Sequence, residues 1–301
     1  STATAAPRQP LQVGLHSPSA PDAGMGAVSV FESAIGRKTD VISVYQSWGN
    51  AWGRNVRNDL LSRATSRGRK IMITWEPWVQ GGGGVQNRYN LASIARGDHD
   101  AYMRSFARGL RAWGKPVYLR PMHEMNGDWY PWGAYTKGTG NNPALYKQAW
   151  QRMYRVFQQE RARNVRFVWS PVAHDWTNLK RYYPGRNFVH IMALDGYNFG
   201  PGDAATGRRS FQQVFLKSYQ RLEKLGPQPI WLAEVASAPD GGYKAVFARQ
   251  MIRAIRAGYY PRLRAVIWFN GVGEFTKLDF RLHTDLGASA ALRSELAAYF
   301  R

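Results

Sequence analysis

Short apolar runs alternate with amphipathic segments along the 301 residues of the chain. Eight of these runs are rich in β-branched and aromatic residues, which is the composition typical of strands. Because the runs are almost continuously hydrophobic, we expect strands that are buried on both faces, as in a parallel sheet. The predicted strands span residues 11–16, 41–48, 70–75, 116–124, 165–171, 190–197, 229–235 and 263–270.

The segments between these runs carry helix signals. Residues 98–113 place Tyr102, Phe106 and Leu110 four positions apart, so that they share one face of a helix. The helix predicted over residues 143–160 starts with the pair Asn142-Pro143, a cap residue followed by proline in the first turn. Strand–helix units repeated eight times in about 300 residues predict a single (β/α)8 barrel domain, with residues 1–10 as a loose N-terminal segment.

The C-terminal ends of the predicted strands are unusually polar and aromatic. Functional side chains of (β/α)8 barrels lie at these ends, which makes the residues there candidates for a site. They are His16, Trp48, Trp75, Glu76, Trp78, Arg120, His123, Glu124, Trp129, Trp132, His174, Asp175, Trp176, Asp195, Tyr197, Asn198, Glu234 and Trp268. His16 and His174 could equally be structural histidines, and Glu76 could be a structural acceptor at the rim; Asp175 is similarly open.

Two of these candidates are glutamates on opposite sides of the barrel mouth. Glu124 lies at the end of the fourth predicted strand and Glu234 at the end of the seventh, so we expect both to point into one cavity. Cleavage of a glycosidic bond requires one protonated carboxyl group and one ionised carboxylate. The surrounding tryptophans fit the same chemistry, since indole rings stack on the apolar faces of sugars while any single tryptophan can also be core.

Composition limits the classes of function and partner that remain. The formal net charge of +21 is spread along the chain, as on an ordinary arginine-rich surface. Contact with an anionic cell surface, matrix or acidic polysaccharide is the alternative, and no nucleic-acid-binding motif accompanies the charge. The absence of cysteine excludes disulfides and thiolate chemistry, and no ligand cluster of the HExxH type predicts a metal. No apolar run is long enough to span a bilayer. We expect a secreted monomer that binds polysaccharide and requires no cofactor.

The segment RPMHEMNGDWYPW at residues 120–132 resembles glycoside hydrolase family 26, a family of retaining endo-glycanases. The similarity continues through TWEPW (74–78), DGYN (195–198), PIWLAE (229–234), IWFN (267–270) and DFR (279–281). The resemblance implies that Glu124 is the acid/base and Glu234 the nucleophile. It also implies the remaining contacts: Tyr197 bonded to the nucleophile, Arg120 beneath both carboxylates, a polar sugar contact from Asp195, substrate contacts from His123, and aromatic walls from Trp129 and Trp268. We add Trp75, Glu76, Trp132, His16 and Asn198 as substrate-binding candidates.

The substrate is harder to derive. Compared with the β-1,4-mannanases of this family, the chain departs at Trp75-Glu-Pro-Trp78, at Trp129-Tyr-Pro-Trp132 and at Phe269 after Trp268. This pattern is closer to the branch of mixed-linkage β-glucanases, so we predict an endo-hydrolase of β-1,3-1,4-glucan. The alternatives are an endo-β-1,4-mannanase, an endo-hydrolase of an acidic exopolysaccharide and a carbohydrate-binding barrel without catalytic activity.

Overall fold

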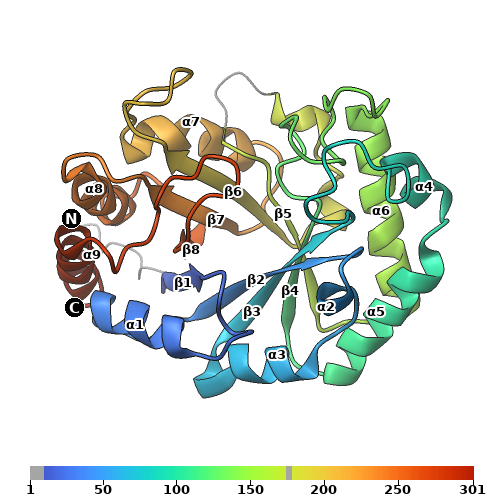
Figure 1. Cartoon of the computed structure of the whole chain (residues 1–301), viewed down its shortest axis with the longest axis horizontal. Helices are drawn as coiled ribbons and strands as arrows, with labels where there is room; N and C mark the ends of the chain where they lie inside the picture. The colour runs from blue at the N-terminus through green and yellow to red at the C-terminus, as the bar shows by residue number, and fades with distance from the viewer. Residues whose placement is uncertain (1–9, 174–177) are drawn as a thin grey trace, which may run out of the picture.

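Eight parallel strands close into a barrel in the order of the sequence (Figure 1). The computed structural model describes residues 10–173 and 178–301. The strands are β1 (Gln12–His16), β2 (Val41–Ser47), β3 (Lys70–Glu76), β4 (Val117–Pro121), β5 (Val165–Trp169), β6 (Ile191–Asn198), β7 (Ile230–Ser237) and β8 (Leu263–Phe269). The predicted (β/α)8 barrel is therefore confirmed, and each predicted strand corresponds to an observed one.

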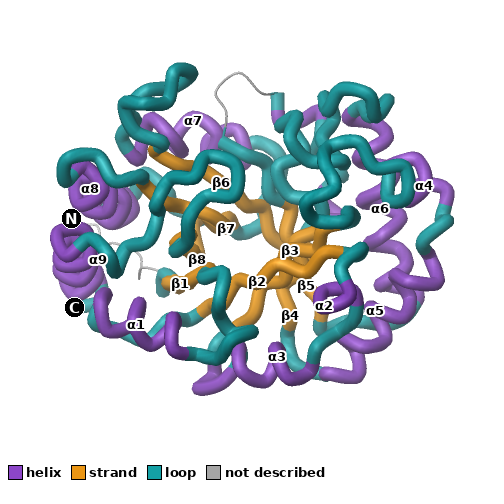
Figure 2. The backbone as a smooth tube through the Cα atoms, viewed as in Figure 1, coloured by secondary structure: helices purple, strands orange, loops and turns teal. Residues whose placement is uncertain are grey.

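Helices surround the strands on the outside of the barrel (Figure 2). They are α1 (Gly26–Ile35), α2 (Ala51–Arg54), α3 (Asn58–Ala64), α4 (Leu91–Arg96), α5 (Asp100–Trp113), α6 (Pro143–Gln159), α7 (Phe211–Glu223), α8 (Tyr243–Arg256) and α9 (Leu286–Tyr299), with the 3₁₀ helices η1 (Ser66–Gly68), η2 (Leu179–Arg181) and η3 (Arg186–Phe188). Over the described residues, none of these helices has the length and apolar character needed to cross a bilayer.

Local sequence signals explain where two of the predicted helices begin and end. The side chain of Asn142 accepts a hydrogen bond from the backbone of Leu145, which caps α6, and Pro143 occupies its first turn. Gly114 terminates α5 with a φ of 77°, a left-handed conformation that glycine adopts without a steric penalty.

Two details of the predicted barrel were wrong, one strand end and one strand–helix connection. The fourth strand ends at Pro121 and not at Glu124, because Met122 and Glu124 have positive φ values that are incompatible with a strand. In addition, β5 is followed in the described residues only by η2 and η3 before β6 begins, so the strand–helix alternation is interrupted there. The candidates His174, Asp175 and Trp176 lie outside the described residues.

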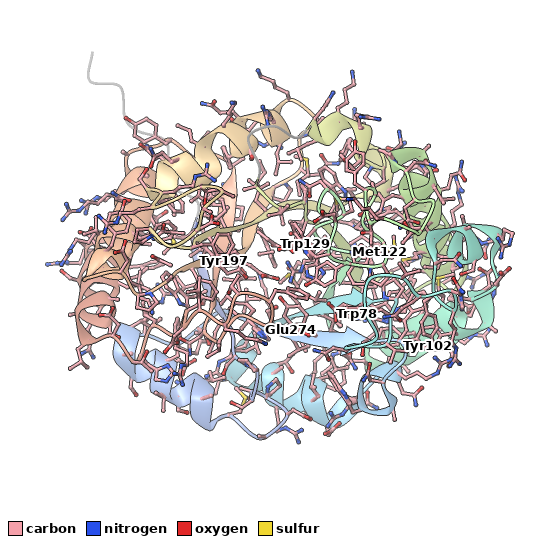
Figure 3. All side chains as sticks on the ribbon, turned by 45° about the horizontal axis from the view of Figure 1, so that its top comes forward. Trp78, Tyr102, Met122, Trp129, Tyr197 and Glu274 are labelled. Carbon is pink, nitrogen blue, oxygen red and sulfur yellow. The ribbon has the colours of Figure 1, made fainter. Side chains whose placement is uncertain are left out.

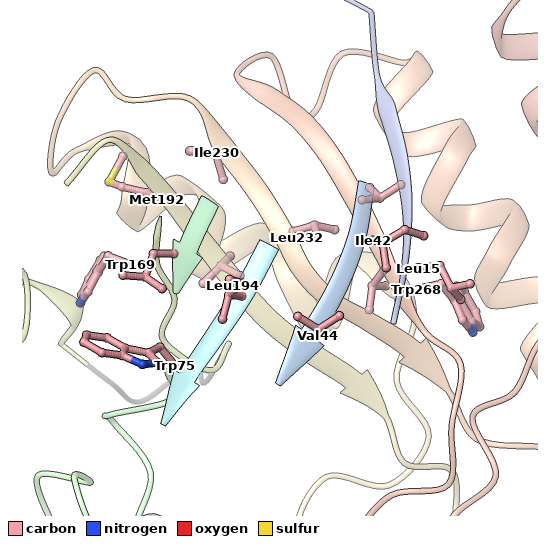
Figure 4. Packing of buried hydrophobic residues seen from close by; sticks show 14 of the residues in the cluster. Leu15, Ile42, Val44, Trp75, Trp169, Met192, Leu194, Ile230, Leu232 and Trp268 are labelled. Atoms are coloured by element: carbon pink, nitrogen blue, oxygen red, sulfur yellow. The ribbon is translucent and has the colours of Figure 1, made fainter. Parts of the chain in front are cut away.

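The core has two layers, because successive side chains of a strand point to opposite faces. One small cluster fills the barrel interior: Val41, Met72, Val168, Ile191, Ala193, Trp231, Ala233, Ala265 and Ile267. A much larger cluster lies between the strands and the helices and includes Leu15, Ile42, Trp75, Leu194, Leu232 and Trp268 (Figure 4). The alternation between these layers determines which strand residues reach the barrel mouth.

Candidate active site

A cavity of about 880 Å³ opens at the C-terminal end of the barrel. Glu124 and Glu234 both line it, together with His16, Tyr45, Trp52, Trp129, Tyr130, Tyr197, Phe199, Phe269, Glu274 and Phe280. Figure 3 shows Trp129, Tyr197 and Glu274 around the centre of the molecule, whereas Tyr102 lies apart on the side of the helices. The barrel therefore brings the two predicted glutamates to one cavity.

Arg120 is the positive centre beneath this cavity. Its side chain on β4 is fully buried, and its Nη2 lies 2.5 Å from Oε1 of Glu234. Its Nη1 donates to both carboxylate oxygens of Asp195 at 2.7 Å, while its Nε donates to Thr74 at 2.9 Å. Arg120 thus pairs with Glu234 and Asp195. The expected partners were Glu124 and Glu234, so the second partner is Asp195 and not Glu124.

A β-bulge directs Glu234 into the cavity. Between Leu232 and Glu234, β7 advances two residues while the adjacent β6 advances one, from Leu194 to Asp195. Ala233 already faces the barrel interior, so regular alternation would place Glu234 among the helices. The extra residue restores an inward orientation for Glu234, which is how bulges commonly re-aim side chains near active sites.

Three donors surround the carboxylate of Glu234. Oε1 accepts hydrogen bonds from Arg120 and from the hydroxyl of Tyr45, and Oε2 accepts one from the hydroxyl of Tyr197. Burial by itself raises the pKa of this carboxyl group, but the charge of Arg120 and the hydrogen bonds lower it below its usual value. Glu234 is therefore ionised at neutral pH, and two donors hold Oε1 while one holds Oε2.

A strained turn presents Glu124. Met122 and Glu124 have φ values of 47° and 55°, a left-handed conformation that costs a non-glycine residue about 1–3 kcal/mol. The turn is tied to β5 by the backbone N–H of Glu124, which donates to the carbonyl oxygen of Ser170 at 2.7 Å. Trp129 donates from its Nε1 to Oε2 of Glu124 at 2.7 Å, which fixes the direction of the carboxyl group.

The two carboxyl groups have opposite tendencies to ionise. Burial, and then the negative charge of Glu234, raise the pKa of Glu124 above its ordinary value, because both effects disfavour a second carboxylate. At neutral pH one group can therefore donate a proton while the other carries a negative charge. This is the division of roles required of an acid and a nucleophile at one site.

Of the other predicted residues, three line the cavity as expected: His16, Trp129 and Tyr197. Nδ1 of His16 lies 3.0 Å from the carbonyl oxygen of Ser43. Since a carbonyl only accepts, this nitrogen carries the proton and Nε2 is left as the acceptor. Tyr197 donates a hydrogen bond directly to the carboxylate of Glu234 through its hydroxyl group.

Trp75 and Trp268 do not face the cavity, so their assignment as substrate contacts is wrong. Trp75 stacks on Phe106 of α5 at 4.8 Å between ring centroids, and Trp268 packs in the layer between strands and helices. Each follows an inward residue, Thr74 or Ile267 respectively, so the two-residue alternation turns the indole outward. Trp132 is also buried away from the cavity, where its Nε1 donates to the carbonyl oxygen of His123 at 2.6 Å.

Asp195 and Asn198 are buried structural groups and not sugar contacts. Besides its pairing with Arg120, Asp195 accepts a hydrogen bond from Ser170 at 2.8 Å. Asn198 donates to Oγ of Ser237 at 2.9 Å, and its side-chain oxygen accepts from the backbone of Arg209. These bonds engage the polar atoms of both side chains, which therefore stabilise the strand ends around the cavity.

His123 and Glu76 lie buried next to the charged centre. The pKa of His123 is lowered well below its ordinary value by burial and by the charge of Arg120, so its ring is neutral, and its Nδ1 has no partner among the described residues. Glu76 accepts a hydrogen bond from Nε1 of Trp78 at 3.1 Å. Burial raises the pKa of Glu76 to about 8, so this third carboxyl group is largely protonated at neutral pH.

Sequence reasoning missed several residues of the cavity wall, among them Tyr45 and Phe269. Tyr45 on β2 donates to the nucleophile candidate, and the ring of Phe269 on β8 lies 4.9 Å from that of His16. Both could have been found from strand alternation, since Tyr45 is four residues after the inward-facing Val41 and Phe269 is two residues after Ile267. A tyrosine inside a strand and a phenylalanine at a strand end do not by themselves indicate a functional site.

Metal binding receives little support from the donor set. One ligand atom from each of His123, Glu124 and Asp195 lies within 4.8 Å of the others. However, both oxygens of Asp195 accept hydrogen bonds from Arg120, and the buried guanidinium would repel a second cation. The arrangement is better suited to proton transfer and nucleophilic attack than to holding an ion.

Comparison with known proteins agrees with this geometry. The sequence profile of Glycosyl hydrolase family 26 matches residues 99–232. Endoglucanase H of Acetivibrio thermocellus is 34% identical over 278 residues, covering 90% of this chain and 29% of the relative. A mannan endo-1,4-beta-mannosidase of Bacillus subtilis is 35% identical over 176 residues, covering 56% of this chain and 44% of the relative. The chain thus spans less than half the length of either relative.

The fold has close counterparts among solved structures. The Bacillus subtilis mannanase man26 superimposes with a TM-score of 0.68 at 22% identity, over 95% of this chain and 85% of that structure. At this level of identity the likeness concerns the barrel architecture alone.

Proposed function

This chain belongs to glycosyl hydrolase family 26, and on that premise we propose that it is a retaining endo-β-glycanase. One observation carries the proposal: a carboxyl group with a raised pKa and a carboxylate with a lowered pKa line the same open cavity. Retaining hydrolysis uses one carboxyl group in each of these states.

In the first step, Glu234 attacks the anomeric carbon of the bound sugar. The bond to the leaving oxygen breaks as the carboxyl proton of Glu124 moves to that oxygen, which leaves a glycosyl ester on Glu234 and an ionised Glu124. Oε2 is the better placed attacking atom, because it accepts one hydrogen bond where Oε1 accepts two. Trp129 keeps Glu124 oriented toward the leaving oxygen.

In the second step, Glu124 takes a proton from water while the water oxygen attacks the same anomeric carbon. The bond to Glu234 breaks, and both groups return to their starting states. The change of role follows from electrostatics. Formation of the ester removes the negative charge of Glu234, which is one of the two causes that raise the pKa of Glu124, so Glu124 becomes a stronger acid and remains ionised as the base.

We favour β-1,3-1,4-glucan as the substrate. The relative that covers 90% of the chain is named an endoglucanase, and the inward residue at the end of β8 is the apolar Phe269. A β-1,4-mannan is the second candidate, because the Bacillus subtilis relative is named a mannan endo-1,4-beta-mannosidase. Since such polymers are found outside cells, we also place the protein's action outside the cell.

The test is digestion of barley β-glucan, lichenan, glucomannan, galactomannan and β-1,3-xylan, with product analysis. We expect mixed-linkage oligosaccharides from the first two, whose first-formed reducing ends have the β configuration by NMR. Glu234→Ala should abolish release, and Glu124→Gln should sharply reduce it on unactivated polysaccharide. Products from galactomannan in place of β-glucan would assign mannan, α-configured first products would refute retention, and no release from any polymer would support a carbohydrate-binding barrel.

A further inference from the structure

The two ends of the barrel differ sharply in charge. Four consecutive helix-to-strand connections lie at the end opposite the cavity and precede β2, β3, β4 and β5 (residues 36–40, 65–69, 114–116 and 160–164). They contain seven lysine or arginine residues and two acidic ones. The connections that follow β1–β4 and β6–β8 at the cavity end contain six basic and eight acidic residues. The excess of positive charge is thus concentrated away from the candidate active site.

Five basic residues of these connections, with Lys70 at the start of β3 and Arg166 in β5, form one surface, which we call the basic face: Lys38, Arg67, Lys70, Lys115, Arg161, Arg163 and Arg166. The amide of Asn164 donates to the carbonyl oxygen of Lys115 at 2.9 Å, which joins the connections before β4 and β5. Arg166 is paired in register with Tyr118, whose ring centroid lies 5.9 Å from Nζ of Lys70. Nζ of Lys38 donates to the carbonyl oxygen of Arg67 at 2.8 Å.

Much of this charge has no acidic partner. The carboxylate of Glu160 pairs with Arg104 and Arg108 on α5, and that of Glu32 pairs with Arg67 and Arg69. Within the described residues, Lys115, Arg161, Arg163 and Arg166 form no ion pair with a carboxylate, and all four are exposed. Uncompensated cations of this density create a field that attracts an extended polyanion.

We propose that the basic face binds an acidic polysaccharide, a polymer with one carboxylate per sugar unit, while the cavity at the opposite end remains free. The charged connections precede adjacent strands, which lie about 4.8 Å apart. A glycan with one charge per residue fits this spacing better than duplex DNA, which carries one charge per about 1.7 Å.

The side chains of the basic face also argue against other polyanions. None of the large apolar side chains exposed in the described part of the chain belongs to these four connections. Insertion into a membrane interface requires such side chains, and binding of single-stranded nucleic acid relies on exposed aromatic rings. The basic face presents mainly cations, beside the half-buried rings of Trp113 and Tyr118, and exposed cations are what a hydrated acidic glycan requires.

The experiment compares two charge-reversal variants that change the net charge equally. The first is Lys115→Glu/Arg163→Glu/Arg166→Glu on the basic face, and the second is Arg88→Glu/Lys137→Glu/Lys277→Glu at the cavity end. Binding of the full chain to immobilised polygalacturonate is measured over a series of salt concentrations. The neutralising variant Lys115→Gln/Arg163→Gln/Arg166→Gln guards against misfolding caused by charge reversal.

We expect the basic-face variant to lose at least about tenfold in affinity and the cavity-end variant less than about threefold, with an intermediate loss for the glutamine variant. Hydrolysis of soluble neutral β-glucan should be unchanged in both basic-face variants. Equal losses in the two charge-reversal variants would overturn the proposal, since net charge alone would then explain binding. Tighter binding of duplex DNA or of phosphatidylglycerol vesicles than of polygalacturonate would overturn the assignment of the polyanion.

Discussion

Replacing Tyr45 by phenylalanine should shift the acid limb of the activity profile to higher pH. The hydroxyl of Tyr45 donates to Oε1 of Glu234, and a hydrogen bond to a charged group contributes about 1.5–3 kcal/mol. One pKa unit corresponds to about 1.4 kcal/mol, so the loss is equivalent to about one to two units. Because Arg120 and Tyr197 still hold the carboxylate, we expect the pKa of Glu234 to rise by about one unit.

The sign follows from the role of Glu234. The carboxylate must be ionised to attack, so activity is lost as the pH falls through its pKa, and a higher pKa moves this loss to higher pH. The assay is the pH dependence of kcat/KM on an aryl β-glycoside. Tyr260→Phe is the matched control, because the buried hydroxyl of Tyr260 has no hydrogen-bond partner among the described residues. An unshifted acid limb in Tyr45→Phe, or an equal shift in both variants, would refute the reasoning.

Three further predictions concern the acid, a buried carboxyl group and an exposed tryptophan of the cavity wall. A Cβ at Gly127 would lie 2.4 Å from the ring of Trp129, so Gly127→Ala should displace the indole from Glu124 and reduce kcat on polysaccharide at least about tenfold, with a smaller loss on aryl glycosides that need little acid assistance; equal losses would contradict this. Burial raises the pKa of Glu76 to about 8 from 4.5, so the wild-type free energy of unfolding should fall by up to about 5 kcal/mol between pH 4.5 and pH 8 on account of this group. Denaturant unfolding at both pH values should show that the free energy of unfolding depends less on pH in Glu76→Gln than in the wild type. Equal pH dependence in the two proteins would contradict this. Trp52 is 45% exposed and lines the cavity, so Trp52→Ala should raise KM severalfold for long oligosaccharides and leave short ones unaffected, whereas Trp52→Phe should retain most of the binding; a uniform change with chain length would argue against a remote sugar contact.

The barrel and the position of its two candidate glutamates could be predicted from sequence because both depend on strong local signals. Continuous apolar runs identify strands buried on both faces, and a glutamate at the end of such a run stands out against its surroundings. Glu124 and Glu234 were therefore recognised as candidates, and the structure places both in one cavity.

The orientation of individual side chains was less accessible. Trp75 and Trp268 were assigned to the cavity from their position near strand ends, but a shift of one residue moves a strand side chain to the other face. Asp195 was misassigned for another reason: its partner Arg120 is 75 residues away in the sequence, and only the closed barrel shows that this pairing removes the carboxylate from contact with sugar.

The bulge in β7 makes the position of the nucleophile depend on a residue count. The extra residue between Leu232 and Val235 shifts the phase of the strand. Straightening the strand with Ala233 retained would rotate the carboxylate of Glu234 toward the helices, whereas deleting Ala233 would place Glu234 directly after the outward-facing Leu232 and so keep it inward. A designer who grafts this acid onto a regular barrel strand would therefore place it directly after an outward-facing residue, without an insertion. The orientation of Glu234 is thus encoded by the spacing of residues along β7 as much as by the identity of the glutamate.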